Sequence, residues 1–223
     1  MPTTTTGPTV PTAPKRRHSA PATVEHDLTV QDARFTGLDF SGFDLSGADL
    51  DGLTLDECLL HEIKLARATT AGLAVTDTTF RNCDLAAAHL EDASLGRTEI
   101  VLTRFLGARL TGAHLRDVTV QQSRAEMSIW RQAKLTRCVF DRVPLTEADF
   151  GNAKLDNVLF QQCELGHAQF SGATCKNVVF EDCRFPGGLN GLAGLRGATV
   201  RSDGALDVAL LLAAEAGITL DLA

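Results

Sequence analysis

A five-residue period constrains this chain more than any other feature. From about residue 27 to residue 185, a large apolar residue recurs at positions divisible by five, from Val30 to Phe185, with lapses at Thr70 and Ala125. A second series, mostly of small residues, lies two positions earlier in each unit. Neither series contains a charged residue, although charged residues make up 22% of the chain. A fixed period of this length indicates a repeat architecture.

Five is the period of neither regular secondary structure. A helix turns every 3.6 residues and would spread such a series around its circumference, whereas a strand would place alternate members on opposite faces. A short extended piece followed by a turn, repeated many times, satisfies the pattern. The large residue and the small residue two before it then point inward, and the other three residues of each unit point outward.

Two stretches resemble the pentapeptide-repeat family: Ser-Gly-Ala-Asp-Leu at 46–50 and Leu-Thr-Gly-Ala-His-Leu at 110–115. The resemblance implies an all-β fold, a right-handed parallel β-helix of square cross-section with four pentapeptides per turn. The sequence itself supports a twenty-residue turn, because Asn-Val-Leu-Phe at 157–160 recurs as Asn-Val-Val-Phe at 177–180. We expect about eight turns, a rod roughly 40 Å long at a strand spacing of roughly 4.8 Å.

The chain divides into three parts on composition. Residues 1–24 are rich in threonine and proline and predict a disordered tail. Lys15-Arg16-Arg17 in this tail is either a solvated charge cluster, the favoured interpretation, or an electrostatic hook for nucleic acid. Residues 25–200 predict the β-helix, including a final partial turn after Phe185, and residues 201–223 predict a capping helix and its tail.

The C-terminal part is apolar nearly all round. Ser202 or Asp203 can cap a helix beginning near Gly204, and Gly217 suits its left-handed C-terminal position. One face would seal the open end of the coil, and a twofold partner helix would cover the other. The resemblance to quinolone-resistance pentapeptide proteins, in layout the mycobacterial type, implies the same dimer. The expected interface is Leu206, Ala209, Leu210, Leu212 and Ala213.

Charge is distributed unevenly along the chain. Between residues 25 and 62 Arg34 is the only base among many acids, whereas from Arg97 to Arg142 the bases outnumber the acids. The net charge of −7 argues against a general nucleic-acid or anionic-membrane binder. The acidic outward positions are either a solvated surface or an imitation of a phosphate backbone. The candidate partner-binding residues are Asp39, Asp44, Asp49, Asp51, Asp56, Glu57 and Glu62.

The six cysteines all fall on inward positions, which a small apolar thiol suits. Cys163 and Cys183 should stack on adjacent turns, where a disulfide is conceivable, but a reduced, cytoplasmic protein is the better interpretation. The sequence shows neither a secretory signal nor a membrane-spanning apolar run. It contains no metal-ligand or phosphate-loop motif, and its histidines fall on different turns and sides. We therefore expect no enzyme, no cofactor and no metal.

Two functional hypotheses follow. The resemblance and the acidic turns favour a DNA-mimicking homodimer that binds a type II topoisomerase, DNA gyrase or topoisomerase IV, and modulates it or protects it from poisons. The alternative is an interaction scaffold that uses the basic belt, Arg97 to Arg142, or an apolar outward row. That row is Val139, Leu159 and Val179, which a flat β face also explains.

Overall fold

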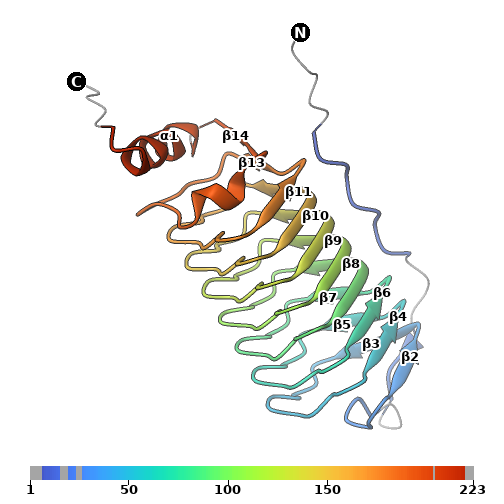
Figure 1. Cartoon of the computed structure of the whole chain (residues 1–223). Helices are drawn as coiled ribbons and strands as arrows, with labels where there is room; N and C mark the ends of the chain where they lie inside the picture. Colours follow the sequence, from blue (N-terminus) through green and yellow to red (C-terminus); the bar gives the residue numbers. More distant parts are fainter. Residues whose placement is uncertain (1–6, 16–19, 24–26, 203, 219–223) are drawn as a thin grey trace.

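The computed structural model describes residues 7–15, 20–23, 27–202 and 204–218, which form a rod of stacked parallel strands with a helix at one end (Figure 1). The strands of the first half are β1 (Ala20–Pro21), β2 (Arg34–Thr36), β3 (Leu38–Ser41), β4 (Thr54–Asp56), β5 (Leu59–His61), β6 (Ala74–Thr76), β7 (Thr79–Arg81) and β8 (Ser94–Val101). Those of the second half are β9 (His114–Gln121), β10 (Lys134–Asp141), β11 (Lys154–Gln161), β12 (Thr174–Lys176), β13 (Val179–Glu181) and β14 (Thr199–Arg201). The helices are η1 (Leu192–Leu195) and α1 (Gly204–Glu215).

The coil advances by twenty residues per turn, as the sequence predicts. Phe140 of β10 lies beside Phe160 of β11, and Phe180 of β13 lies beside Val200 of β14. The expected final turn is therefore present, and the coil has about nine turns. Between residues 169 and 190 the register lengthens by one residue, at Pro186-Gly187-Gly188, and it returns to twenty by β14.

The large apolar series fills the rod. In the second half its aromatic members form two stacks on opposite faces: Phe140, Phe160 and Phe180 on one, and Trp130, Phe150 and Phe170 on the other. Ala125, with no exposed surface, lies in the same turn as buried Trp130. Thr70 is buried and donates its hydroxyl to the His89 carbonyl at 2.9 Å, so its polar atom is satisfied at that lapse. The first member, Val30, is 57% exposed at the open end, and Phe35, Leu45 and Cys175 are partly buried.

The corners of the square coil use left-handed backbone. The residue two after each large apolar residue has a positive φ, whether it is glycine, as at Gly47, or not, as at Arg97 and Leu102. This conformation costs about 1–2 kcal/mol for a residue with a Cβ. The stacked turns on either side hold each corner in place, so the fold tolerates many such residues.

The cysteines lie where the sequence places them. Five are buried, and Cys175 is partly buried against the core. All six are free thiols, including Cys163 and Cys183. Each of those two donates its thiol to a phenylalanine carbonyl of the preceding turn. The thiols therefore serve as small core residues with weak donors.

The first residues differ from the expected disordered tail. Residues 7–15 run along the rod, and β1 adds a parallel strand to β3 at the entry end (Figure 1). Two backbone N–H groups, of Thr12 and Lys15, bond to carboxylates of the coil. Arg16 and Arg17 of the predicted basic cluster lie outside the described residues.

Candidate functional site

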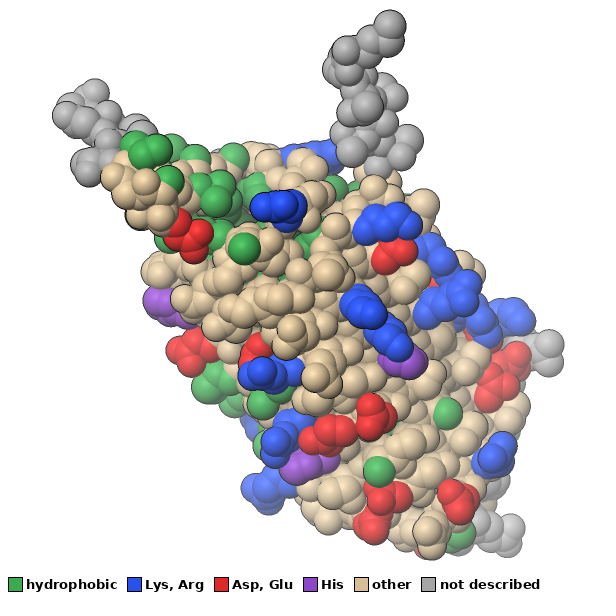
Figure 2. Space-filling view, viewed as in Figure 1, with side chains coloured by type: hydrophobic (Ala, Val, Ile, Leu, Met, Phe, Trp, Pro, Cys, Tyr) green, Lys and Arg blue, Asp and Glu red, His purple; other side chains and the backbone are tan. Residues whose placement is uncertain are grey.

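The acidic residues predicted as a partner surface surround the entry end of the rod. Asp39 lies in β3, Asp44 and Asp49 form bridges on the next two faces, and Asp56 lies in β4 on the fourth face. Glu57 and Glu62 occupy left-handed corners between faces. In Figure 2 acidic side chains gather toward the lower end of the visible face. The structure therefore distributes these charges around a cylinder, and no single side presents all of them.

Several of these carboxylates also accept hydrogen bonds from backbone N–H groups and so stabilise the local structure. Asp49 accepts the Asp51 N–H at 3.1 Å, and Asp51 accepts the Ala71 N–H of the next turn at 2.7 Å. Asp44 accepts the Ser46 N–H and pairs with Lys64 Nζ at 3.3 Å, and these contacts lower the pKa of Asp44. The Asp44–Lys64 pair is exposed, so it contributes little to stability.

Asp39 is less available than the sequence suggests. β1 pairs with β3 at this position, and Asp39 is half-buried. Its Oδ1 atom is buried and accepts no hydrogen bond from the described residues. The added strand could not be foreseen because it comes from the segment expected to be disordered.

The arginines of the middle turns are paired. Residues at the same position in successive turns stack about one strand spacing apart, so a carboxylate at one position meets a base twenty residues later. Arg97 with Asp77, Arg104 with Asp84 and Arg137 with Asp117 follow this rule. The other arginines between 97 and 142 also have carboxylate partners: Arg109, Arg116, Arg124, Arg131 and Arg142. The basic belt is thus a network of ion pairs.

In two of these ion pairs the arginine contacts both carboxylate oxygens and the aspartate is buried. Arg97 and Arg137 each donate Nε and an η nitrogen to both carboxylate oxygens of Asp77 and Asp117 respectively, and both aspartates are nearly buried. These arginine hydrogen bonds are the main cause that lowers the pKa of each aspartate, and a backbone N–H of the N-terminal segment lowers it further. The sequence analysis missed this site. Alternating Asp and Arg at twenty-residue spacing was the signal that could have revealed it.

Helix α1 seals the exit end of the coil, as expected. Gly204 is buried, and a Cβ there would lie 2.5 Å from the Cys183 carbonyl oxygen, so only glycine permits this approach. Val208 and Leu211 continue the same face and pack against the core. The helix ends at Glu215, and Gly217 has the predicted left-handed φ of 71°. Asp203, one of the two expected caps, lies outside the described residues.

The opposite face of α1 is open. Leu206 and Leu212 are 54% and 51% exposed, Ala209 is exposed, and Leu210 and Ala213 are half-buried. A cavity of about 370 Å³ lies between α1, η1 and β14, lined mainly by leucine, valine and alanine. The five residues predicted to form the dimer contact therefore form an apolar surface without a described partner segment.

The apolar outward row offers less surface than expected. Val139, Leu159 and Val179 stack in register on β10, β11 and β13. Val179 is only 4% exposed, and the other two are half-buried. The burial of these residues favours the interpretation of the row as part of a flat β face over that of an exposed partner-binding strip.

Three further features of the described residues concern metal-ligand groups, interior cavities and membrane-spanning helices. The described residues contain no group of three histidine, cysteine, aspartate or glutamate side chains placed to hold a metal ion. Two cavities between described core residues of the coil measure about 20 Å³ each, enough for little more than a water molecule. No described helix is long and apolar enough to cross a membrane.

Comparison with known families identifies the repeat. A family model described as a pentapeptide repeat region matches residues 73–150 and 129–187, and a second, of eight pentapeptide repeats, matches residues 31–66. The two models together cover more than half of the chain. This chain is a pentapeptide-repeat protein. Its fold is accordingly the right-handed parallel β-helix that the resemblance implied.

Several solved structures match the chain at low identity. QnrB1, a plasmid-mediated fluoroquinolone resistance protein in a trypsin-treated form, is 22% identical with a TM-score of 0.43 over 86% of this chain and 91% of that one. HetL, involved in heterocyst differentiation regulation in the cyanobacterium Nostoc sp. strain PCC 7120, is 18% identical with a TM-score of 0.38, over 79% and 92%. A thylakoid-lumen protein of Arabidopsis thaliana is 21% identical with a TM-score of 0.41, over 43% of this chain and 66% of its own. No curated protein matches the sequence.

Proposed function

We propose that this pentapeptide-repeat protein binds a type II topoisomerase, DNA gyrase, in place of DNA and so modulates the enzyme or protects it from poisons. The observation that carries the proposal is the charge of the first two turns. Carboxylates project there from all four sides of a rod, and Arg34 is the only lysine or arginine between residues 27 and 62. A duplex likewise presents negative charge around its whole circumference.

The ion-pair network limits the contact to the entry end. Beyond the second turn several carboxylates pair with an arginine one turn away, as Asp77, Asp84 and Asp117 do, which cancels the field of each pair at a distance. A cleft lined with lysine and arginine would therefore capture the rod end-on. The partner contact should involve Asp44, Asp49, Asp51, Asp56, Glu57 and Glu62, with Asp39 contributing less because β1 covers it.

The proposal includes a homodimer through α1, with Leu206, Ala209, Leu210, Leu212 and Ala213 at the contact. It also places the protein in the cytoplasm, where gyrase operates. A twofold arrangement through the exit ends would leave both acidic entry ends free. This geometry follows from the position of α1 at the opposite end of the rod from β2 (Figure 1).

The test is a gyrase supercoiling and poison-induced cleavage assay with the purified full chain. We expect inhibition of supercoiling or protection from the poison, with an effect that weakens as salt rises. Replacing the exposed acids Asp44, Asp49 and Glu62 by their amides should reduce the apparent affinity at least tenfold. The matched control replaces Glu147, Glu164 and Asp182, which are exposed in the second half, by their amides and should leave the effect unchanged.

If the native chain affects neither gyrase nor topoisomerase IV at low salt, the proposal fails. Equal losses in the two amide variants would also contradict it, since the effect would then follow net charge alone. The alternative, a scaffold for another protein, would take its place. The pentapeptide-repeat family supports a scaffold in general, whereas the burial of the stacked row Val139, Leu159 and Val179 weakens that row as its contact surface.

A further inference from the structure

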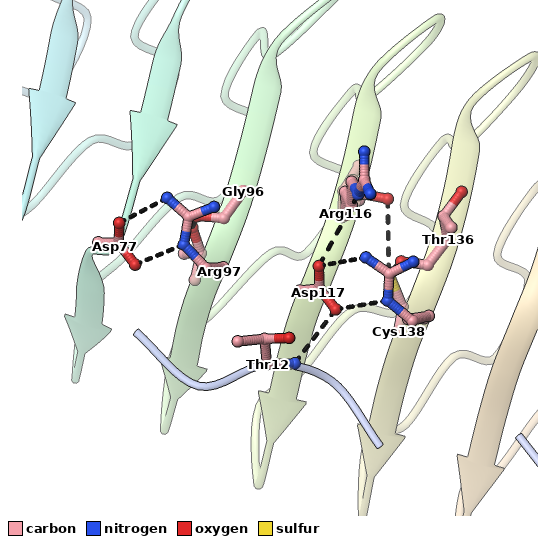
Figure 3. A network of polar contacts seen from close by, with 11 residues as sticks. Thr12, Asp77, Gly96, Arg97, Arg116, Asp117, Thr136 and Cys138 are labelled. Atoms are coloured by element: carbon pink, nitrogen blue, oxygen red, sulfur yellow. Dashed lines mark hydrogen bonds and ion pairs between the residues drawn. The ribbon is translucent and has the colours of Figure 1, made fainter. Parts of the chain in front are cut away.

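The N-terminal segment occupies one corner of the coil. Thr12 donates its backbone N–H to Asp117 Oδ1 at 3.1 Å, and Lys15 donates its N–H to Asp77 Oδ1 at 3.0 Å. The segment therefore runs from the turn of Asp117 back to that of Asp77, opposite to the direction in which the coil grows. Figure 3 shows the segment crossing in front of the strands, with Thr12 at Asp117.

The two contacts are copies of one arrangement. Each aspartate occupies a left-handed corner and is held by the arginine of the following turn, Arg97 or Arg137, through Nε to Oδ1 at 2.7 Å. The same Oδ1 accepts the N–H of the segment. The arginine neutralises and orients the nearly buried carboxylate, and one lone pair remains for an amide. The acceptors thus repeat at every second turn along this corner.

The spacing of the donors fits the spacing of the acceptors. Two turns of the coil advance roughly 9.6 Å at the strand spacing of a parallel sheet. Three residues of a polyproline II chain advance roughly 9.3 Å. Thr12 and Lys15 are three residues apart, whereas Asp117 and Asp77 are two turns apart. A polyproline II segment also has no internal hydrogen bonds, so its N–H groups are free to donate.

The proline pattern has the same period. Pro8, Pro11 and Pro14 recur every third residue, and Pro11 and Pro14 directly precede the two donors, Thr12 and Lys15. Pro14 is buried and the other two are half-buried, whereas the intervening residues are exposed. A three-residue period of burial is the one that a polyproline II helix with three residues per turn produces. The prolines also lower the entropy lost when the segment docks.

We propose that the corner formed by Asp77, Arg97, Asp117 and Arg137 is a binding site for an extended peptide with proline at every third residue, and that residues 7–15 of the same chain are its ligand. The site accepts the backbone N–H groups of Thr12 and Lys15, which follow the second and third of these prolines. The twenty-residue repeat of the coil sets the distance between the two acceptors. This inference is independent of the gyrase proposal, because it involves a different part of the rod.

The first test is amide hydrogen exchange of the native full chain. The Thr12 and Lys15 amides should exchange at least tenfold more slowly than those of Val10 and Ala13, relative to their rates in a free peptide of residues 7–15. Asp117→Asn should speed exchange at Thr12 more than at Lys15, and Asp77→Asn should do the reverse. Asparagine tolerates the left-handed corner, so both variants should fold. Uniform exchange across the segment would overturn the proposal.

The second test measures binding in trans. Thr12→Pro with Lys15→Pro, in the full chain, removes both N–H donors while keeping a polyproline backbone, so the segment should leave the site. A fluorescent peptide of residues 7–15 should then bind at least tenfold more tightly than to the native chain, by anisotropy. Ala13→Pro keeps both donors and is the matched control, which should bind the peptide no better than the native chain.

The aspartates decide whether such binding is specific. Adding Asp77→Asn and Asp117→Asn to the donor-free variant should abolish peptide binding, while circular dichroism shows an intact coil. Binding that survives these changes, or no binding to a folded donor-free variant, would refute the site.

Discussion

Trp130 donates its indole N–H to the Ser128 hydroxyl at 2.7 Å inside the coil, and Ser128 in turn donates to the Ala125 carbonyl at 2.6 Å. All three residues are almost fully buried. The largest side chain of the core thus has its one polar atom satisfied within its own turn. The small residue at the position of Ala125 belongs to the same turn, so the second lapse of the apolar series coincides with the indole.

Removing the Ser128 hydroxyl, which accepts the Trp130 N–H, should destabilise the protein. In Ser128→Ala the buried Trp130 N–H loses its partner, and we expect the free energy of unfolding to fall by about 1–3 kcal/mol. Urea denaturation followed by circular dichroism measures the change. Ser94→Ala, on the exposed face of β8, is the control and should stay within about 0.5 kcal/mol of the native chain. Equal midpoints for both variants would show that water or a shifted indole replaces the bond.

The thiols should be inert in the folded protein. Burial raises the pKa of Cys138 to about 12 and that of Cys175 to about 11, so little thiolate is present at pH 8. We expect native protein to react with a disulfide reagent slowly, and all six cysteines to react in denaturant. Cys175, the only one partly exposed, should react first, and Cys175→Ser should remove that phase. Rapid reaction of several thiols in the native protein would contradict the burial of the cysteines in the core of the coil.

Low pH should remove the stabilisation that the Asp77–Arg97 and Asp117–Arg137 pairs provide. The pKa values of Asp77 and Asp117 lie below the ordinary 3.8 in the folded chain, mainly because of Arg97 and Arg137. The unfolded chain then binds protons first, so their contribution is complete above pH 3.8 and is lost as pH falls through the lower folded values. Asp77→Asn and Asp117→Asn should each cost about 1–3 kcal/mol at pH 7.

The pH dependence distinguishes this effect from a general loss of packing. The difference between native and variant chains in urea unfolding should be the same at pH 7 and pH 5 and should shrink below pH 3.8. Asp182→Asn is the control, because Asp182 sits at a comparable corner with φ 52° and forms no ion pair among the described residues. A difference that persists unchanged at pH 2 would refute the electrostatic account.

The open face of α1 should hold two chains together. Leu206→Asp with Leu212→Asp places charge on the two most exposed leucines of the helix, so light scattering should give the monomer mass in place of the dimer. β-Sheet circular dichroism should be unchanged, because Val208 and Leu211 still seal the coil. Leu102→Asp, at an exposed corner elsewhere on the rod, should leave the dimer intact. A native chain that is already monomeric would refute this contact.

Much of the fold could be predicted because its interactions repeat. In the coil each repeat meets the residues twenty positions before and after it, so the five-residue series specifies core, faces and corners together. The extent of α1 followed from Gly204 and Gly217. The face of the rod on which each acidic residue lies also follows from its position within the twenty-residue turn.

The sequence by itself therefore determined the coil and its core, since both depend on contacts at one constant separation, and it determined the closing helix through the glycines near its two ends. Only the tertiary structure decided where residues 7–15 lie. Their contacts with Asp117 and Asp77 span 105 and 62 residues, and no period of the coil links the two partners. A polyproline II segment also has no hydrogen bonds of its own that could reveal its conformation. Its ordering depends on acceptors that exist only after the turns have stacked.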